Sequence, residues 1–149
     1  MNTIWTSRYQ SDAVARLVKA GEIVPVRTSL GAPRMTLSYP LSEQIRPIAP
    51  HGRNFKLQGD AFDEAYLRQL GRSGVHKFQE AFESLWEQYP DRDLVLCCFE
   101  NVWAGEGCHR RLFAEWWQEQ TGTVIEELPA TAGLDEPEPE PTQLGLLDG

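Results

Sequence analysis

The sequence is poor in cysteine, has no long apolar run and carries no excess of basic residues. Its three cysteines, at positions 97, 98 and 108, form an odd and clustered set. Such a set is not typical of a disulfide framework. No apolar run approaches the roughly 20 residues that span a bilayer. The N-terminus has no basic segment followed by an apolar stretch, so we expect no secretory signal. These absences favour a cytoplasmic protein without a membrane partner.

The charge balance disfavours a large nucleic-acid-binding face. The net charge is -8, whereas such faces are strongly basic. The acidic residues are spread unevenly, because five of them and no basic residue lie between Asp135 and the end of the chain. The rest of the chain is therefore closer to neutrality and can still hold a local basic pocket. The candidate arginines for such a pocket are Arg8, Arg27, Arg34, Arg110 and Arg111.

Strand-like and helix-like apolar patterns alternate along the chain. The continuous apolar run from Leu94 to Phe99 is typical of a strand buried on both faces, as in a parallel sheet. The alternation predicts a Rossmann-like, three-layer α/β domain with a mostly parallel sheet over residues 1–130. The strands expected are 3–5, 23–28, 94–99 and 124–128, the helices expected are 13–18, 60–70, 75–89 and 108–121, and a long ordered loop is expected over 35–56.

A polar cluster is expected where the apolar strand ends and the next helix begins. Cys98 and Glu100 end the strand, and Cys108, His109 and Arg110 begin the helix. Ligands of open parallel sheets bind outside the carboxyl ends of the strands. The free amides and the dipole of a helix start suit an anion. The arginine fork fits a phosphate or carboxylate, and the same field favours a thiolate on Cys108.

The same residues allow other interpretations. Cys98 could be a small core residue, and Glu100 could hold an arginine in a structural salt-bridge network across the edge of the sheet. Cys97 points to the opposite sheet face and is expected to be structural. A metal site built from Cys98, Cys108 and His109 is disfavoured, because the sequence has no Cys-x-x-Cys pair and no clear fourth ligand.

Two segments resemble a known family signature. Residues 96–100, Leu-Cys-Cys-Phe-Glu, and residues 108–114, Cys-His-Arg-Arg-Leu-Phe-Ala, resemble the signature of the family called domain of unknown function 488. Shorter N-terminal pieces, at 6–9, 27–29, 33–34 and 48–50, resemble its first strand end, its second strand, its Pro-Arg loop and a Leu-Ala-Pro segment. The resemblance covers residues 3–128, and it departs from the family in the long insert at 101–107.

The resemblance implies a Rossmann-like fold but no firmly established activity, and the sequence leaves any cofactor unknown. From the polar cluster we expect an enzyme or enzyme-like protein that acts on a phosphate-bearing or nucleotide-like ligand, with DNA metabolism as the expected setting. Cys98 or Cys108 would be the nucleophile or redox thiol, and Glu100 and His109 would handle protons. The alternative is a non-catalytic module that binds a nucleotide or a nucleic-acid end and is tethered to the sliding clamp. The expected ligand-binding residues are Ser7, Arg8, Ser29, Arg34 and Arg110.

Residues 131–149 are expected to form a disordered tail. Residues 135–141 alternate acid and proline and cannot bury enough apolar surface to fold. They are followed by Gln143, Leu144, Leu146 and Leu147, spaced as in the Gln-Leu-x-Leu-Phe peptide that binds bacterial sliding clamps. Such peptides place a few anchors in a preformed groove. The alternative is that the leucines dock back on the domain.

The tail generates the first testable prediction. A peptide of residues 141–149 is expected to bind the sliding clamp of the host with micromolar or weaker affinity. Burial of two leucines supplies about 3–6 kcal/mol, and ordering the peptide costs about 2–5 kcal/mol. Titration of the peptide against the clamp measures this. Equal binding by a peptide with Gln143, Leu146 and Leu147 changed to Ala contradicts the prediction.

Overall fold

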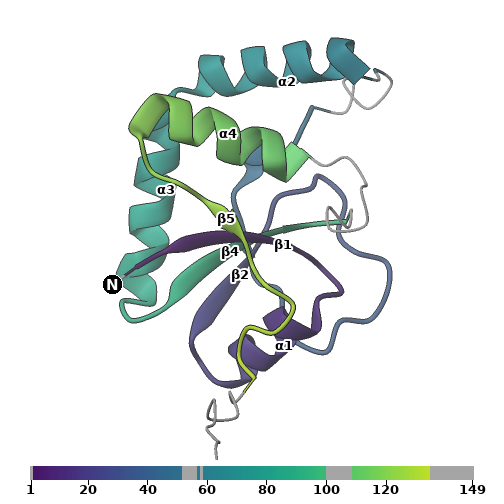
Figure 1. The fold of residues 1–149 in the computed structure, drawn as a ribbon, viewed down its shortest axis with the longest axis vertical. Helices are drawn as coiled ribbons and strands as arrows, with labels where there is room; N and C mark the ends of the chain where they lie inside the picture. Colours follow the sequence, from purple (N-terminus) through teal and green to yellow (C-terminus); the bar gives the residue numbers. More distant parts are fainter. Residues whose placement is uncertain (1, 52–56, 58, 100–108, 135–149) are drawn as a thin grey trace, which may run out of the picture.

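The computed structural model describes residues 2–51, 57, 59–99 and 109–134, which form strands and helices in alternation (Figure 1). Most elements follow the apolar periodicity, and their bounds agree with the expected ones to within a few residues. In chain order they are β1 (Ile4–Arg8), α1 (Asp12–Lys19), β2 (Ile23–Arg27), β3 (Glu43–Gln44), the 3-10 helix η1 (Arg46–Ile48), α2 (Gly59–Ser73), α3 (Val75–Gln88), β4 (Asp93–Cys98), α4 (His109–Thr121) and β5 (Glu126–Glu127).

The five strands form one sheet in the order β3-β2-β4-β1-β5. Every pairing in this sheet is parallel. The central strand β4 is buried along most of its length, as expected from its continuous apolar run. The prediction of a Rossmann-like α/β fold with a parallel sheet is therefore confirmed.

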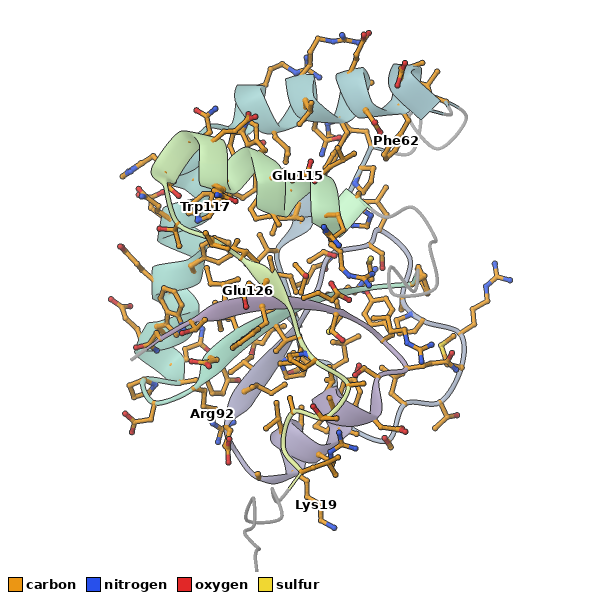
Figure 2. The ribbon with its side chains drawn as sticks, in the orientation of Figure 1. Lys19, Phe62, Arg92, Glu115, Trp117 and Glu126 are labelled. Atoms are coloured by element: carbon orange, nitrogen blue, oxygen red, sulfur yellow. The ribbon has the colours of Figure 1, made fainter. Side chains whose placement is uncertain are left out.

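Helices cover both faces of the sheet and make three layers. Helix α1 packs on one face, where Val14 and Leu17 join Val95 of β4. Helices α2, α3 and α4 supply the core of the opposite face. Figure 1 shows α1 and α4 on opposite sides of the strands. Side chains fill the space between α4 and the sheet, while Lys19 extends away from the end of α1 (Figure 2).

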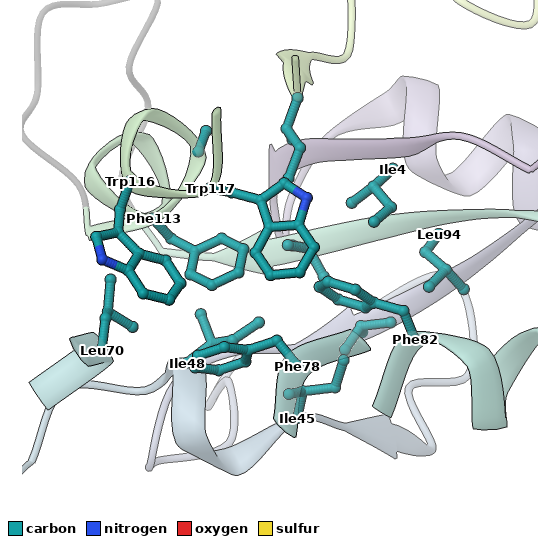
Figure 3. Close-up of a cluster of buried hydrophobic side chains, with 14 of the residues drawn as sticks. Ile4, Ile45, Ile48, Leu70, Phe78, Phe82, Leu94, Phe113, Trp116 and Trp117 are labelled. Atoms are coloured by element: carbon teal, nitrogen blue, oxygen red, sulfur yellow. The ribbon is translucent and has the colours of Figure 1, made fainter. Parts of the chain in front are cut away.

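The core of the larger face is aromatic (Figure 3). Phe78 of α3 makes edge-to-face contacts with Phe113 and Trp116 of α4, with ring centroids 5.2 and 5.7 Å apart. Phe82 contacts Trp117 in the same way at 5.3 Å. Such pairs add to the free energy of area burial and fix the angle between the rings. They hold α3 and α4 together, and α4 carries the predicted site residues at its start.

The chain segments that follow β1 and β4 pass to opposite faces of the sheet. These strands are neighbours, with Arg8 opposite Cys98 at their carboxyl ends. The chain leaves β1 through α1 on one face and leaves β4 through α4 on the other. Ligands of open α/β sheets bind at such a topological switch point. The fold therefore places the favoured binding position beside Arg8 and the start of α1.

Two details differ from the expectation. The expected loop over 35–56 contains the two-residue strand β3 and the helix η1, which are too short to produce an apolar period.

Residues 131–134, assigned to the tail, lie against α1, because the Arg16 guanidinium donates to the carbonyls of Ala130 and Ala132. In the part of the chain that the structure describes, no helix is long and apolar enough to cross a membrane.

Candidate functional site

A buried ion pair ties the start of α4 to the last strand. The Arg110 guanidinium donates from Nε to Glu127 Oε1 at 3.0 Å and from Nη2 to Oε2 at 2.7 Å. The two side chains are 0% and 4% exposed. Thr6 of β1 donates its hydroxyl to Glu127 Oε1 at 2.6 Å. This two-pronged geometry is the one that satisfies a desolvated carboxylate. It favours a structural role for Arg110 over the anion-binding role that the sequence suggested.

Cys98 lies against the same arginine. Arg110 Nη1 lies 2.8 Å from the sulfur of Cys98, which is fully buried at the end of β4. The sulfur is disulfide-bonded, whereas Cys97 is a free thiol. One bonded cysteine does not make a disulfide framework, and the expected role of Cys98 as a nucleophile or redox thiol stays a prediction.

Cys97 has the character of a core residue. It is fully buried on the α1 side of β4. Burial raises the pKa of its thiol to about 12. A thiol with this pKa is protonated and unreactive near neutral pH. These properties agree with the structural role expected for this cysteine.

His109 is neutral and is hydrogen-bonded within the protein. Its Nε2 lies 2.9 Å from the carbonyl oxygen of Thr28, to which it donates. The ring also meets the ring of Tyr66 edge to face, with centroids 5.8 Å apart. Burial lowers the pKa of His109 to about 4, and the hydrogen bond to Thr28 opposes this only in part. A base of this pKa is poorly matched to proton transfer near neutral pH.

The hydroxyl of Ser29 is also used inside the protein. It donates to the carbonyl of Gly31 at 2.6 Å and lies 2.7 Å from the hydroxyl of Tyr9, from which it accepts. Tyr39 in turn donates to the carbonyl of Tyr9 at 2.7 Å. This network orders the loop after β2 and leaves Ser29 4% exposed. The serine therefore holds the loop rather than an external ligand.

Ser7 and Arg8 have a different environment. They line a cavity of about 490 Å³ with Ser11, Asp12 and Glu127. Ser7 is 3% exposed, and its hydroxyl makes no hydrogen bond with any described residue. The guanidinium of Arg8 likewise forms no hydrogen bond or ion pair within the described chain. These two predicted residues are the ones whose polar groups remain available at the edge of the sheet.

The structure does not gather all the predicted residues into one pocket. Arg34 is exposed in the loop between β2 and β3 and is absent from the cavity of Ser7 and Arg8. Glu100 and Cys108 lie outside the described residues, as do the tail residues 143–147. Their roles stay predictions. Among residues 2–51, 57, 59–99 and 109–134, no three His, Cys, Asp or Glu side chains gather to hold a metal ion.

Sequence reasoning missed the partners of the buried polar residues. Glu127 falls in the short segment expected to be the last strand, and an acid in a buried strand requires a cation. An ion pair between Glu127 and one of the arginines could therefore have been predicted from the sequence. Thr6 and Tyr9 gave no signal, because a threonine or a tyrosine in or beside a strand is common.

Comparison with protein-family models, with curated proteins and with solved structures found no match. The resemblance to the domain of unknown function 488 family therefore stays a prediction, supported by the segments quoted above.

The environment of His109 generates a prediction about stability and pH. Its pKa is about 4 in the folded protein and near 6.5 when unfolded. The unfolded state therefore takes up the proton first as pH falls. The contribution of neutral His109 to the free energy of unfolding is fully present above about pH 6.5. About 3 kcal/mol of that free energy is lost as the pH falls to 4. Urea unfolding at pH 7 and pH 4 measures this loss.

The variant His109→Gln is expected to lose less stability than the native protein over this pH range. His76→Gln is the matched control, because the side chain of His76 is 84% exposed and pairs with Glu80 on the surface of α3. An equal loss of unfolding free energy in the native protein and in His109→Gln contradicts the assigned environment.

Proposed function

We propose that this protein binds a small phosphate-bearing molecule in the cavity at the carboxyl end of β1. The phosphate is held by the hydroxyl of Ser7, the guanidinium of Arg8 and the first turn of α1. The observation that carries the proposal is that Ser7 and Arg8 line this cavity and that neither side chain makes a hydrogen bond with a described residue.

The start of α1 supports an anionic ligand. Ser11 caps the helix, and its side chain accepts from the backbone N–H of Val14 at 3.3 Å. The backbone N–H groups of Asp12 and Ala13 have no acceptor among the described residues, and both residues line the cavity. Free N–H groups and the helix dipole together attract a phosphate. The cavity therefore offers three kinds of donor to one anion.

Two acids, Glu127 and Asp12, line the cavity, and their effects on a bound anion differ. The charge of Glu127 is neutralised by Arg110 at 2.7 Å, and Thr6 occupies one of its oxygens. Asp12 is exposed in the first turn of α1 and is free to accept a hydrogen bond from a hydroxyl or amino group. The mixed lining fits a ligand with both a phosphate and hydrogen-bond donors, such as a nucleotide.

The described side chains favour binding over catalysis. His109, Arg110 and Ser29, which were expected at the active site, are buried and make their hydrogen bonds within the protein. Cys98 is disulfide-bonded. The enzymatic role that the sequence suggested stays a prediction, because Glu100 and Cys108 lie outside the described residues. The binding role depends on described residues.

The proposal predicts that Ser7→Ala and Arg8→Gln weaken phosphate binding. A hydrogen bond to a charged group is worth about 1.5–3 kcal/mol, so each change is expected to raise the dissociation constant tenfold or more. A melting-temperature screen of inorganic phosphate, pyrophosphate and nucleoside monophosphates selects the probe, since a ligand of the folded state raises the melting temperature. Calorimetric titration then gives the affinities.

Arg34→Gln is the matched control for Arg8→Gln. It removes an exposed arginine that does not line the cavity, and it is expected to bind the probe as tightly as the native protein. A screen without any stabilising phosphate compound contradicts the proposal. Weaker binding in Arg34→Gln with unchanged binding in Arg8→Gln contradicts it as well.

A further inference from the structure

A second cavity, of about 680 Å³, lies beside η1 and the junction of α2 and α3. It shares no residue with the cavity of Ser7 and Arg8. Its described lining is basic in a protein whose net charge is -8, because the described residues around it include Arg46, His51 and Lys77 and no acid. Within the described chain, the side chains of Arg46 and Lys77 form no ion pair or hydrogen bond. Two basic side chains without an ion-pair partner in the described chain, beside one cavity, attract an anion.

One wall of this cavity is fixed by buried hydrogen bonds. The side chain of Gln69 on α2 accepts from the backbone N–H of His51 at 2.9 Å and donates to the carbonyl of Ala49 at 2.7 Å. The hydroxyl of Tyr66 donates to the carbonyl of Ile48 at 2.6 Å. Both side chains are buried. Segment 48–51 is thus held against α2 without a ligand, and preorganisation of this kind lowers the cost of binding.

The start of α3 adds positive potential near the same cavity. Its N-cap residue is Gly74, at a φ of 84°, which makes no side-chain capping bond, and the first turn contains no acid. The neighbours Ser73 and Lys77 both line the cavity. Uncapped N–H groups at a helix start favour an anion. The acid in the next turn, Glu80, is occupied by His76 at 3.1 Å.

We infer that this basic cavity is a second anion site, which takes a small phosphate monoester with an apolar group attached. Arg46, His51 and Lys77 face the phosphate, and Ser73 supplies a neutral donor. The apolar group lies on Leu30 and the wall of segment 47–49. The cavity volume lies within the range of small-molecule sites. The inference does not depend on the proposed function, because the two cavities share no residue.

The experiment is an NMR titration of the full-length, ¹⁵N-labelled protein with phenyl phosphate at constant pH and ionic strength. Saturable shifts are expected for the backbone amides of Val75, His76 and Lys77. Inorganic phosphate is expected to bind the same amides more weakly, because it cannot cover the apolar wall. Arg46→Gln and Lys77→Gln are each expected to weaken phenyl phosphate binding about tenfold.

Arg111→Gln is the matched control, since Arg111 is an exposed arginine on α4 outside this cavity. It is expected to bind phenyl phosphate as the native protein does, and the melting temperatures of the free variants check that each one folds. The absence of shifts in the first turn of α3 at millimolar phenyl phosphate overturns the inference. Tighter binding of a short oligonucleotide at equal phosphate concentration overturns the assignment to a small molecule.

Discussion

The buried ion pair between Arg110 and Glu127 is the interaction on which the carboxyl edge of the sheet depends. Removal of two charges from water is costly, and the cost is recovered only when the geometry is good and the remaining polar atoms are satisfied. Here Arg110 spans both carboxylate oxygens, Thr6 donates to one of them and Cys98 lies against Nη1. The Arg110 guanidinium therefore joins α4 to β5 through Glu127 and to the end of β4 through Cys98. Glu127 in turn joins this group to β1, because it accepts the hydrogen bond from Thr6. These are the elements that surround the topological switch point.

This pairing decides which arginine can meet a ligand. Arg110 is fully buried, and Arg8 is half-buried at the neighbouring strand end. The neutralised Glu127 also lowers the negative charge of the cavity that Ser7 and Arg8 line. His109 has a similar structural part, because its hydrogen bond to Thr28 fixes the start of α4 against the end of β2. At the carboxyl edge of the sheet, buried side chains such as Arg110 and His109 therefore hold the elements together, and Ser7 and Arg8 remain available as hydrogen-bond donors.

The fold could be predicted from the sequence because its signals are local. The apolar period of residues 75–89 and the continuous run at 94–99 predicted α3 and β4, and the parallel sheet followed from the alternation of strands and helices. The strand β3 could not be predicted, since two polar residues carry no period. The site was predicted only in part. The position of the first strand end indicated that Arg8 would lie at the edge, and the family resemblance added Ser7. Neither could show which arginine would be buried in a pair with Glu127, which lies 17 positions from Arg110 along the chain.

A double-mutant cycle on Arg110 and Glu127 tests this account most directly. Urea unfolding is measured for the native protein, Arg110→Met, Glu127→Leu and the double variant at pH 7. Each single change leaves the other charge buried without its partner and is predicted to lower the unfolding free energy by about 3–5 kcal/mol. The double variant is predicted to lose much less than the two changes together, because two apolar side chains then fill the site. The account would be contradicted if each single variant lost less than about 1 kcal/mol of unfolding free energy and if the loss in the double variant equalled the sum of the two, as for an exposed pair.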